Sequence, residues 1–206
     1  MAPFIDTINI QPQSVYLEKI LFLEKLLLQS DKDKVLSELN IILESHGWGN
    51  SNQIGLRHRV GATDPWADAI GSLYDREKQV KIANESMFTE WTLDSDSYTR
   101  QQIELLQSSL GIEIGRVRFM RLAPKCGLSV HRDDEVRYHL VLKTNTESYM
   151  SHATNFVVEQ DSSEPIVAAC YHMPADGNWW QVDTRETHWV YNGGWEERIH
   201  LVVCGV

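Results

Sequence analysis

Residues 116–123 read RVRFMRLA, and this stretch decides the fold class. Basic side chains at Arg116 and Arg118 alternate with apolar ones, and a period of two is typical of a β-strand whose two faces differ. In the C-terminal half the same period recurs in short runs of β-branched and aromatic residues, with turn residues between them. We therefore expect strands at 116–123, 129–131, 136–144, 155–160, 165–172, 179–182, 189–191 and 198–203, and an earlier strand at 54–60.

Eight or nine short strands with no helix between them predict an α+β protein with a mainly β core. The expected architecture is a double-sheet jelly roll, which leaves a mouth for a ligand between its sheets. No linker rich in Pro, Gly or Ser divides the chain. We expect a single domain over 1–206, with a mainly helical and loop part at 1–110 packed on a jelly-roll core at 111–206.

The N-terminal half carries helical patterns instead. Apolar residues at three- and four-residue spacing predict an amphipathic helix from Ser14 to about Ser30 and another from Asp31 or Lys32 to Ser45. Shorter signals predict a helical stretch opened by Asp64-Pro65 and a helix over 97–110. The stretch 71–96 has only a weak pattern and is expected to form loops. We expect the apolar stripes of the helices to pack on the core, although partner binding is the alternative.

Composition limits the classes of function. The formal net charge is -10, so the broad basic surface of a nucleic-acid-binding protein is missing. The three cysteines form no CxxC pair, which argues against a disulfide framework and against a thiolate zinc site. The apolar run at 21–28 is interrupted by charges and is shorter than a membrane span. We expect a cytoplasmic protein with no nucleic-acid or membrane partner.

The candidate metal site is formed by His131, Asp133 and His188. In a strand, residues two apart point to the same side, so His131 and Asp133 converge whereas Asp134 points away. Two imidazoles and one carboxylate are the ligands of non-haem Fe(II) oxygenases, which keep the other coordination positions open. An isolated H-x-D pattern is a weak signal, and a solvated turn is the alternative.

Arginines on three expected strands support a site. Arg198 shares a strand face with His200, Arg137 with His139, and Arg116 with Arg118, while the intervening residues are apolar. Each strand taken alone could instead expose its polar face to solvent on one side of a sheet. The joint pattern favours a binding site.

Five segments together resemble a known family. They are RFMRLAP at 118–124, HRD at 131–133, RYH at 137–139, and HWVYN at 188–192 followed by RIHL at 198–201. They look like the aspartyl/asparaginyl β-hydroxylase family of Fe(II)- and 2-oxoglutarate-dependent oxygenases, which have a double-stranded β-helix, or cupin-like, fold. The resemblance covers roughly 116–206.

The resemblance implies roles for individual residues. His131, Asp133 and His188 would bind Fe(II), and Arg198 would bind the distal carboxylate of 2-oxoglutarate. His139 would lie by the other carboxylate of this cosubstrate, with Arg137 nearby or on the substrate. The implied reaction is hydroxylation with O2, in which an unactivated C–H of an amino acid or peptidyl residue is oxidised and succinate and CO2 are released.

Two interpretations stay open at this stage. In the first, the protein is a hydroxylase that acts on a small-molecule amino acid or on a peptide or protein. At least one of Arg116, Arg118 and Arg137 would then bind a carboxylate group of the substrate. The other is a cupin-like barrel that binds metal or a small acid without turnover. The presence of Arg198 favours the hydroxylase, because a protein that only stores metal needs no residue to bind a distal carboxylate. A peptide substrate requires an open groove, which the stretch 71–96 is expected to shape.

Overall fold

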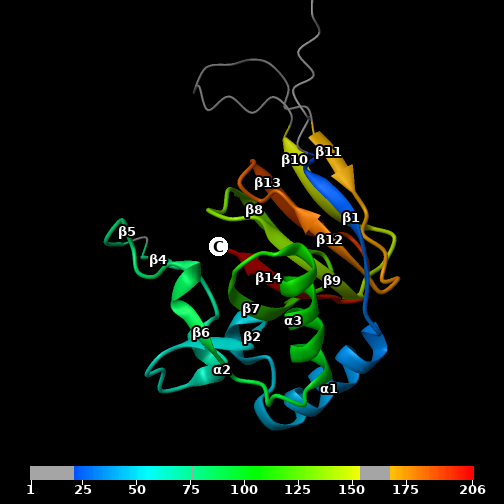
Figure 1. The fold of residues 1–206 in the computed structure, drawn as a ribbon. Coiled ribbons are helices and arrows are strands. Elements are labelled where there is room, and N and C mark those ends of the chain that lie inside the picture. Colours follow the sequence, from blue (N-terminus) through cyan, green and yellow to red (C-terminus); the bar gives the residue numbers. More distant parts are fainter. Residues whose placement is uncertain (1–20, 76, 154–167) are drawn as a thin grey trace, which may run out of the picture.

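The computed structural model describes residues 21–75, 77–153 and 168–206, and two packed sheets dominate it (Figure 1). The larger sheet has six strands in the order β1-β12-β9-β14-β7-β2, and the smaller has four in the order β11-β10-β13-β8. Every strand pair in both sheets is antiparallel. This arrangement is the predicted jelly roll.

The bounds of the sheet strands follow. The larger sheet contains β1 (Leu23–Gln29), β2 (Gln53–Gly55), β7 (Ile114–Leu122), β9 (Arg137–Lys143), β12 (Asn178–Val182) and β14 (Arg198–Gly205). The smaller sheet contains β8 (Cys126–His131), β10 (Ser148–Ala153), β11 (Ala168–Tyr171) and β13 (His188–Asn192).

The remaining elements lie outside these two sheets. The helices are α1 (Lys32–His46), α2 (Pro65–Asp68) and α3 (Tyr98–Leu110), with short 3-10 helices η1 (Gly49–Ser51) and η2 (Glu85–Met87). Two small antiparallel pairs join β3 (Arg57–Arg59) to β6 (Phe88–Trp91) and β4 (Tyr74–Asp75) to β5 (Val80–Lys81). No helix in the described ranges is long and apolar enough to cross a membrane.

Three of the four predicted helix starts are confirmed, each with a capping side chain. Asp31 accepts hydrogen bonds from two backbone amides of α1, Asp64 does the same for α2, and Ser97 accepts one from α3. These bonds satisfy amides that have no partner inside the helix. Gly47 and Gly111 end α1 and α3 at a positive φ of 62° each, which suits glycine.

The helix predicted from Ser14 to Ser30 is wrong where it can be compared. Residues 14–20 lie outside the described residues, and Leu23–Gln29 forms strand β1. β1 pairs with β12, with Leu23 opposite Val182 and Lys25 opposite Trp180. Pairing with β12 gives the backbone groups on one side of β1 their hydrogen-bond partners, and Leu26 becomes buried. Tertiary context therefore overrides helix propensity here.

Other departures from the sequence expectations are local. The stretch 71–96 contains β4, β5, η2 and β6 rather than only loops, and the expected strand at 54–60 is divided between β2 and β3. Strand β10 was not expected, because its sequence SYMSHA lacks a β-branched run; its neighbours β11 and β13 fix it by pairing. The strand expected at 155–160 and the start of the one expected at 165–172 lie outside the described residues.

The two faces of the large sheet bury different kinds of side chain. On the outer face, Phe119, Leu140 and Leu201 pack with residues of α1 and α3 in the main hydrophobic core. The inner face is turned toward the smaller sheet, and at one end Leu122, Val141 and Met150 form a second apolar cluster. The inner face continues from this cluster into a row of arginines and histidines.

Candidate metal centre

The row of polar side chains is buried, so it is not the solvent side of a sheet. The register pairs Arg118 with Val202 and Arg198 with Leu122, which places both arginines on the inner face. Arg116, Arg118, His139, Arg198 and His200 are each 7% exposed or less. Burying charged groups is costly unless they are paired or bind a charged ligand, so the unpaired members of this row make the inner face a candidate ligand site.

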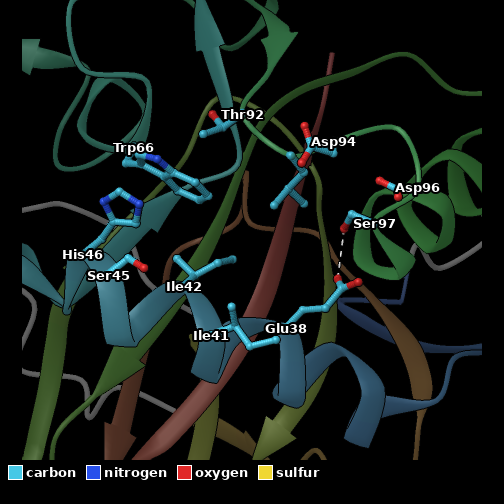
Figure 2. A pocket seen from close by; sticks show the side chains of 11 residues that line it. Glu38, Ile41, Ile42, Ser45, His46, Trp66, Thr92, Asp94, Asp96 and Ser97 are labelled. Atoms are coloured by element: carbon cyan, nitrogen blue, oxygen red, sulfur yellow. Dashed lines mark hydrogen bonds between the residues drawn. The ribbon is translucent and has the colours of Figure 1, made fainter.

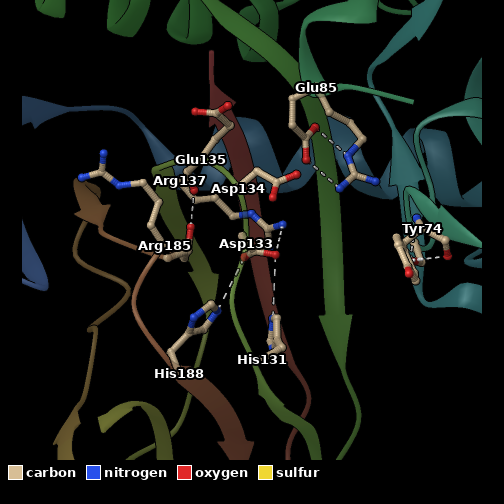
Figure 3. Close-up of polar contacts among 12 residues, drawn as sticks. Tyr74, Glu85, His131, Asp133, Asp134, Glu135, Arg137, Arg185 and His188 are labelled. Atoms are coloured by element: carbon tan, nitrogen blue, oxygen red, sulfur yellow. Dashed lines mark hydrogen bonds and ion pairs between the residues drawn. The ribbon is translucent and has the colours of Figure 1, made fainter. Parts of the chain in front are cut away.

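The structure brings His131, Asp133 and His188 together, as predicted. His131 ends β8, His188 begins β13, and the two strands pair at these residues. Asp133 lies just beyond the end of β8, where its backbone amide donates to the Thr184 carbonyl oxygen at 2.8 Å. One ligand atom from each of the three side chains lies within 4.8 Å of the others. Figure 3 shows both imidazoles directed at the carboxylate.

Backbone carbonyls orient both imidazoles. Nδ1 of His131 lies 2.6 Å from the Ser129 carbonyl oxygen, and Nδ1 of His188 lies 2.8 Å from the Glu186 carbonyl oxygen. A carbonyl can only accept, so Nδ1 carries the proton in each ring and the Nε2 lone pair is directed toward Asp133. Burial also lowers the pKa of His188, which favours the neutral imidazole that a metal requires.

Asp133 offers one oxygen to an ion. Its Oδ1 atom accepts an ion-pair hydrogen bond from Arg137 Nη2 at 2.6 Å. Its Oδ2 atom is buried, has no hydrogen-bond partner and lies 3.6 Å from His188 Nε2. An orphaned carboxylate oxygen beside two imidazole lone pairs fits a divalent cation, and the bond to Arg137 is the outer contact that commonly orients a ligating carboxylate. The donor set of two imidazoles and one carboxylate fits Fe(II).

Asp134 turns away from the centre, as expected. Its carboxylate forms an ion pair with Lys81 at 2.6 Å. Lys81 belongs to the β4–β5 hairpin, which extends away from the sheets in Figure 1. This pair therefore joins the hairpin to the loop that carries Asp133.

A cavity of about 680 Å³ opens beside the metal centre. His131, Asp133 and Arg137 line it together with Arg116 and Arg118. The opposite wall comes from the stretch expected to shape the mouth, through residues Gly71, Ser72, Leu73, Tyr74, Lys81 and Glu85. The volume lies within the usual range for small-molecule sites.

Arg116 binds both ends of the segment 71–85, the hairpin wall, which lines one side of the cavity. Its guanidinium forms two hydrogen bonds with the Glu85 carboxylate, at 2.9 and 3.0 Å, and donates to the Gly71 carbonyl oxygen at 3.0 Å. Gly115 makes this possible, because a Cβ atom there would collide with the Glu85 backbone. Arg116 thus lines the cavity while it holds together the two ends of the segment that walls it.

Glu85→Ala is expected to lower the free energy of unfolding by about 3–5 kcal/mol, because it leaves the buried Arg116 charge without its partner. Urea denaturation of both proteins measures the difference. Glu104→Ala, which removes an exposed i,i+4 pair with Arg100, is the matched control and is expected to cost below about 1 kcal/mol. Equal losses in the two variants would contradict the structural role of the Arg116–Glu85 pair.

Arg198, His139 and His200 form a second cluster on the inner face. Arg198 Nη2 donates to His200 Nδ1 at 3.1 Å, and the Nδ1 atoms of His139 and His200 lie 3.2 Å apart. Burial and the nearby Arg198 charge hold the pKa of both imidazoles well below its usual value. Burial also lowers the pKa of Arg198 to about 9, which leaves it protonated at neutral pH. Among the described residues no carboxylate forms an ion pair with Arg198.

Several residues of this region gave no signal in the sequence. Glu85, Lys81 and Gln53 come from segments far from the motifs, and only the folded chain brings them to Arg116, Asp134 and Arg118. His152, which lies outside these motifs, stacks on Phe22 with ring centroids 4.4 Å apart.

A smaller hollow of about 420 Å³ lies between α1 and the segment before α3 (Figure 2). Of its three acidic residues, Glu38, Asp94 and Asp96, Glu38 is already bound by Ser97 Oγ and by the backbone amides of Tyr98 and Thr99. The Glu38 carboxylate therefore caps α3.

The jelly roll and its group of two histidines and one carboxylate are typical of metal-dependent oxygenases. A sequence profile described as aspartyl/asparaginyl beta-hydroxylase matches residues 34–205. The chain belongs to this family, which makes it an oxygenase of the hydroxylase type. Sequence comparison with curated proteins gives no match.

Two solved structures with low sequence identity share the fold, HygX and SnoN. HygX from Streptomyces hygroscopicus, with iron bound, has a TM-score of 0.51 at 8% identity and covers 95% of this chain and 86% of its own. SnoN, a non-heme alpha ketoglutarate dependent epimerase from nogalamycin biosynthesis, has a TM-score of 0.50 at 14% identity. The match covers 90% of this chain and 78% of the SnoN chain. An oxidoreductase of the 2OG-Fe(II) oxygenase family from Burkholderia pseudomallei has a TM-score of 0.40 at 16% identity. The match covers 55% of this chain and 60% of that chain.

Proposed function

We propose that the protein is a dioxygenase dependent on Fe(II) and 2-oxoglutarate. It hydroxylates an unactivated C–H of an amino acid or peptidyl residue and releases succinate and CO2. The observation that carries the proposal is the convergence of His131, Asp133 and His188 in a jelly roll that also buries Arg198, which has no acidic partner within the described part of the chain. A metal site alone would not require the second feature.

The three ligands would hold Fe(II) through Nε2 of His131, Nε2 of His188 and Oδ2 of Asp133. When bound, the iron and its cosubstrate supply the oxidising chemistry that converts O2 and a C–H bond into an alcohol, while 2-oxoglutarate is decarboxylated. The protein binds, orients and encloses the reactants. Arg137 holds the other oxygen of Asp133 and so fixes the direction of this ligand.

Arg198 would bind the distal carboxylate of 2-oxoglutarate. A planar guanidinium matches a carboxylate with two parallel hydrogen bonds, and burial strengthens their attraction. Fe(II), Asp133 and 2-oxoglutarate together carry one negative charge, which Arg198 neutralises. His200 accepts a hydrogen bond from Arg198 and so limits the rotation of the guanidinium.

His139 would lie at the other carboxylate of the cosubstrate. Its Nε2 atom is buried and has no hydrogen-bond partner. His200 Nδ1 accepts from Arg198, so Nδ1 of His139 is the donor within the histidine pair and its Nε2 carries a lone pair. An arriving carboxylate would raise the pKa of His139 and favour the protonated ring, which donates from Nε2.

A product assay tests this function. The purified protein is incubated with Fe(II), 2-oxoglutarate and O2 together with amino acids and short peptides, and succinate and oxygen-labelled products are measured by mass spectrometry under ¹⁸O2. The proposal requires succinate formation that a substrate stimulates, with one oxygen atom from O2 in the product. Tight binding of Fe(II) without succinate formation would instead favour a barrel that binds metal without turnover.

A further inference from the structure

Two adjacent tryptophans of β12 face opposite sides of the large sheet. Trp179 pairs with Leu140 and packs in the main core of the outer face, where its Nε1 atom donates to Ser30 Oγ at 2.9 Å. Trp180 pairs with His139 and packs against the second apolar cluster, on the inner face. The Trp180 Nε1 atom is buried and has no hydrogen-bond partner. Of the two indoles, only the inner-face one is left with an unused donor.

The unused donor of Trp180 indicates a missing partner. An indole N–H can only donate, and a donor that is buried without an acceptor is destabilising. Native structures rarely keep such a group unless a ligand or an ion completes it. Lys25 Nζ, which is paired with Asp176 at 2.7 Å, lies over the Trp180 ring at 5.7 Å from its centroid, a contact that helps to hold the ring in place.

A second donor of the inner face also lacks an acceptor. Arg198 Nη2 donates to His200 Nδ1, so the proton of the neutral His200 ring is on Nε2, which is buried and has no partner. His139 lies between the two donors: it is opposite Trp180 in the sheet, and its Nδ1 atom lies 3.2 Å from that of His200. The acceptors for these groups must come from a ligand, and carboxylate oxygens only accept.

We propose that Trp180 is a further cosubstrate-binding residue, whose indole N–H donates to the same carboxylate of 2-oxoglutarate as His139. This inference rests on the proposed function and adds to it a residue outside the predicted site. Side chains directly opposite each other in an antiparallel pair have Cβ atoms about 5 Å apart, so both can reach one carboxylate. The indole fixes this carboxylate without adding a charge, while Arg198 serves the distal one.

Affinity for the cosubstrate tests the proposal without turnover. Trp180→Phe removes the N–H and keeps an aromatic ring, and the Fe(II)-loaded protein is titrated calorimetrically with 2-oxoglutarate under argon. The variant is expected to bind 2-oxoglutarate about 10- to 100-fold more weakly, as for the loss of a buried hydrogen bond to a charged group. Trp179→Phe makes the same change on the outer face and is expected to bind it like the wild type. Wild-type affinity in Trp180→Phe, or an equal loss in both variants, overturns the proposal.

Nuclear magnetic resonance reports the hydrogen bond itself. The protein is labelled with ¹⁵N-tryptophan, and diamagnetic Zn(II), which accepts the same ligands, replaces Fe(II). The Nε1–H signal of Trp180 is identified by its absence from Trp180→Phe. Addition of 2-oxoglutarate is expected to move this signal downfield and to slow the exchange of its hydrogen, while the Trp179 signal stays in place. Binding of 2-oxoglutarate without a change in the Trp180 signal contradicts the inference.

Thermal unfolding of the metal-free protein separates a binding role from a structural one. Trp179→Phe loses the hydrogen bond to Ser30, whereas Trp180→Phe loses none, so the unfolding midpoint is expected to fall less in Trp180→Phe. A fall at least as large as that of Trp179→Phe would make the Trp180 N–H a structural group and overturn the proposal. If the wild type binds 2-oxoglutarate and Trp180→Phe binds it equally well, only this inference fails. Failure of the wild type to bind 2-oxoglutarate contradicts the proposed function, and the inference with it.

Discussion

His131→Ala and His188→Ala are each expected to abolish iron-dependent turnover and to remove stoichiometric Fe(II) binding. Each variant deletes one of the three proposed protein ligands, and the imidazole that remains cannot replace it because a backbone carbonyl fixes its orientation. Fe(II) binding is measured by anaerobic equilibrium dialysis, and turnover by succinate formation. Far-UV circular dichroism records whether the fold is retained.

The two histidines differ in solvent exposure, so their replacement by alanine should disturb the packing to different extents. The His131 side chain is 33% exposed, whereas that of His188 is 2% exposed, so His131→Ala is the variant expected to perturb packing less. His58→Ala is the matched control, since His58 lies on β3 outside the jelly-roll sheets. Wild-type iron binding in a folded His131→Ala protein would exclude the proposed triad.

Arg198→Ala is expected to weaken 2-oxoglutarate binding by at least about 100-fold. Removal of one partner of a buried charge pair costs about 3–5 kcal/mol, and each 1.4 kcal/mol corresponds to a tenfold change in affinity. Calorimetric titration of the Fe(II)-loaded protein under argon measures this loss. Fe(II) binding itself should persist, because Arg198 touches none of the three ligands.

Two further variants isolate the role of the guanidinium. Arg198→Lys keeps a charge but cannot form the two parallel hydrogen bonds, so its affinity for 2-oxoglutarate should lie between those of the wild type and Arg198→Ala. Arg121→Met on the outer face should bind 2-oxoglutarate like the wild type. Unchanged affinity in Arg198→Ala would remove this residue from the cosubstrate site.

The face on which a candidate side chain lies could be predicted for residues within strands, because side chains alternate there with a strict period of two. Arg198 and His200, like Arg137 and His139, share a face whichever strands become neighbours. Periodicity could not say whether that face meets solvent or a second sheet. The burial of His200 and Arg198 decides it, and this depends on the packing of the smaller sheet.

The contacts around the site could not be predicted from local pattern. Glu85 lies 31 residues before Arg116, and Gln53 lies 65 residues before Arg118. Each pair meets only after the hairpin wall and β2 have docked on β7. The same limit explains the error at Leu23–Gln29, where the partner strand β12 comes about 150 residues later in the chain and decides the conformation.

The most direct test of the account is an anaerobic absorption titration of the protein with Fe(II) and 2-oxoglutarate. The account predicts a visible metal-to-ligand charge-transfer band that requires both additions, is absent in His188→Ala and needs far more 2-oxoglutarate in Arg198→Ala. If iron binds normally and 2-oxoglutarate produces no such band, the cosubstrate does not chelate the metal, and the assignment as a 2-oxoglutarate-dependent oxygenase is contradicted.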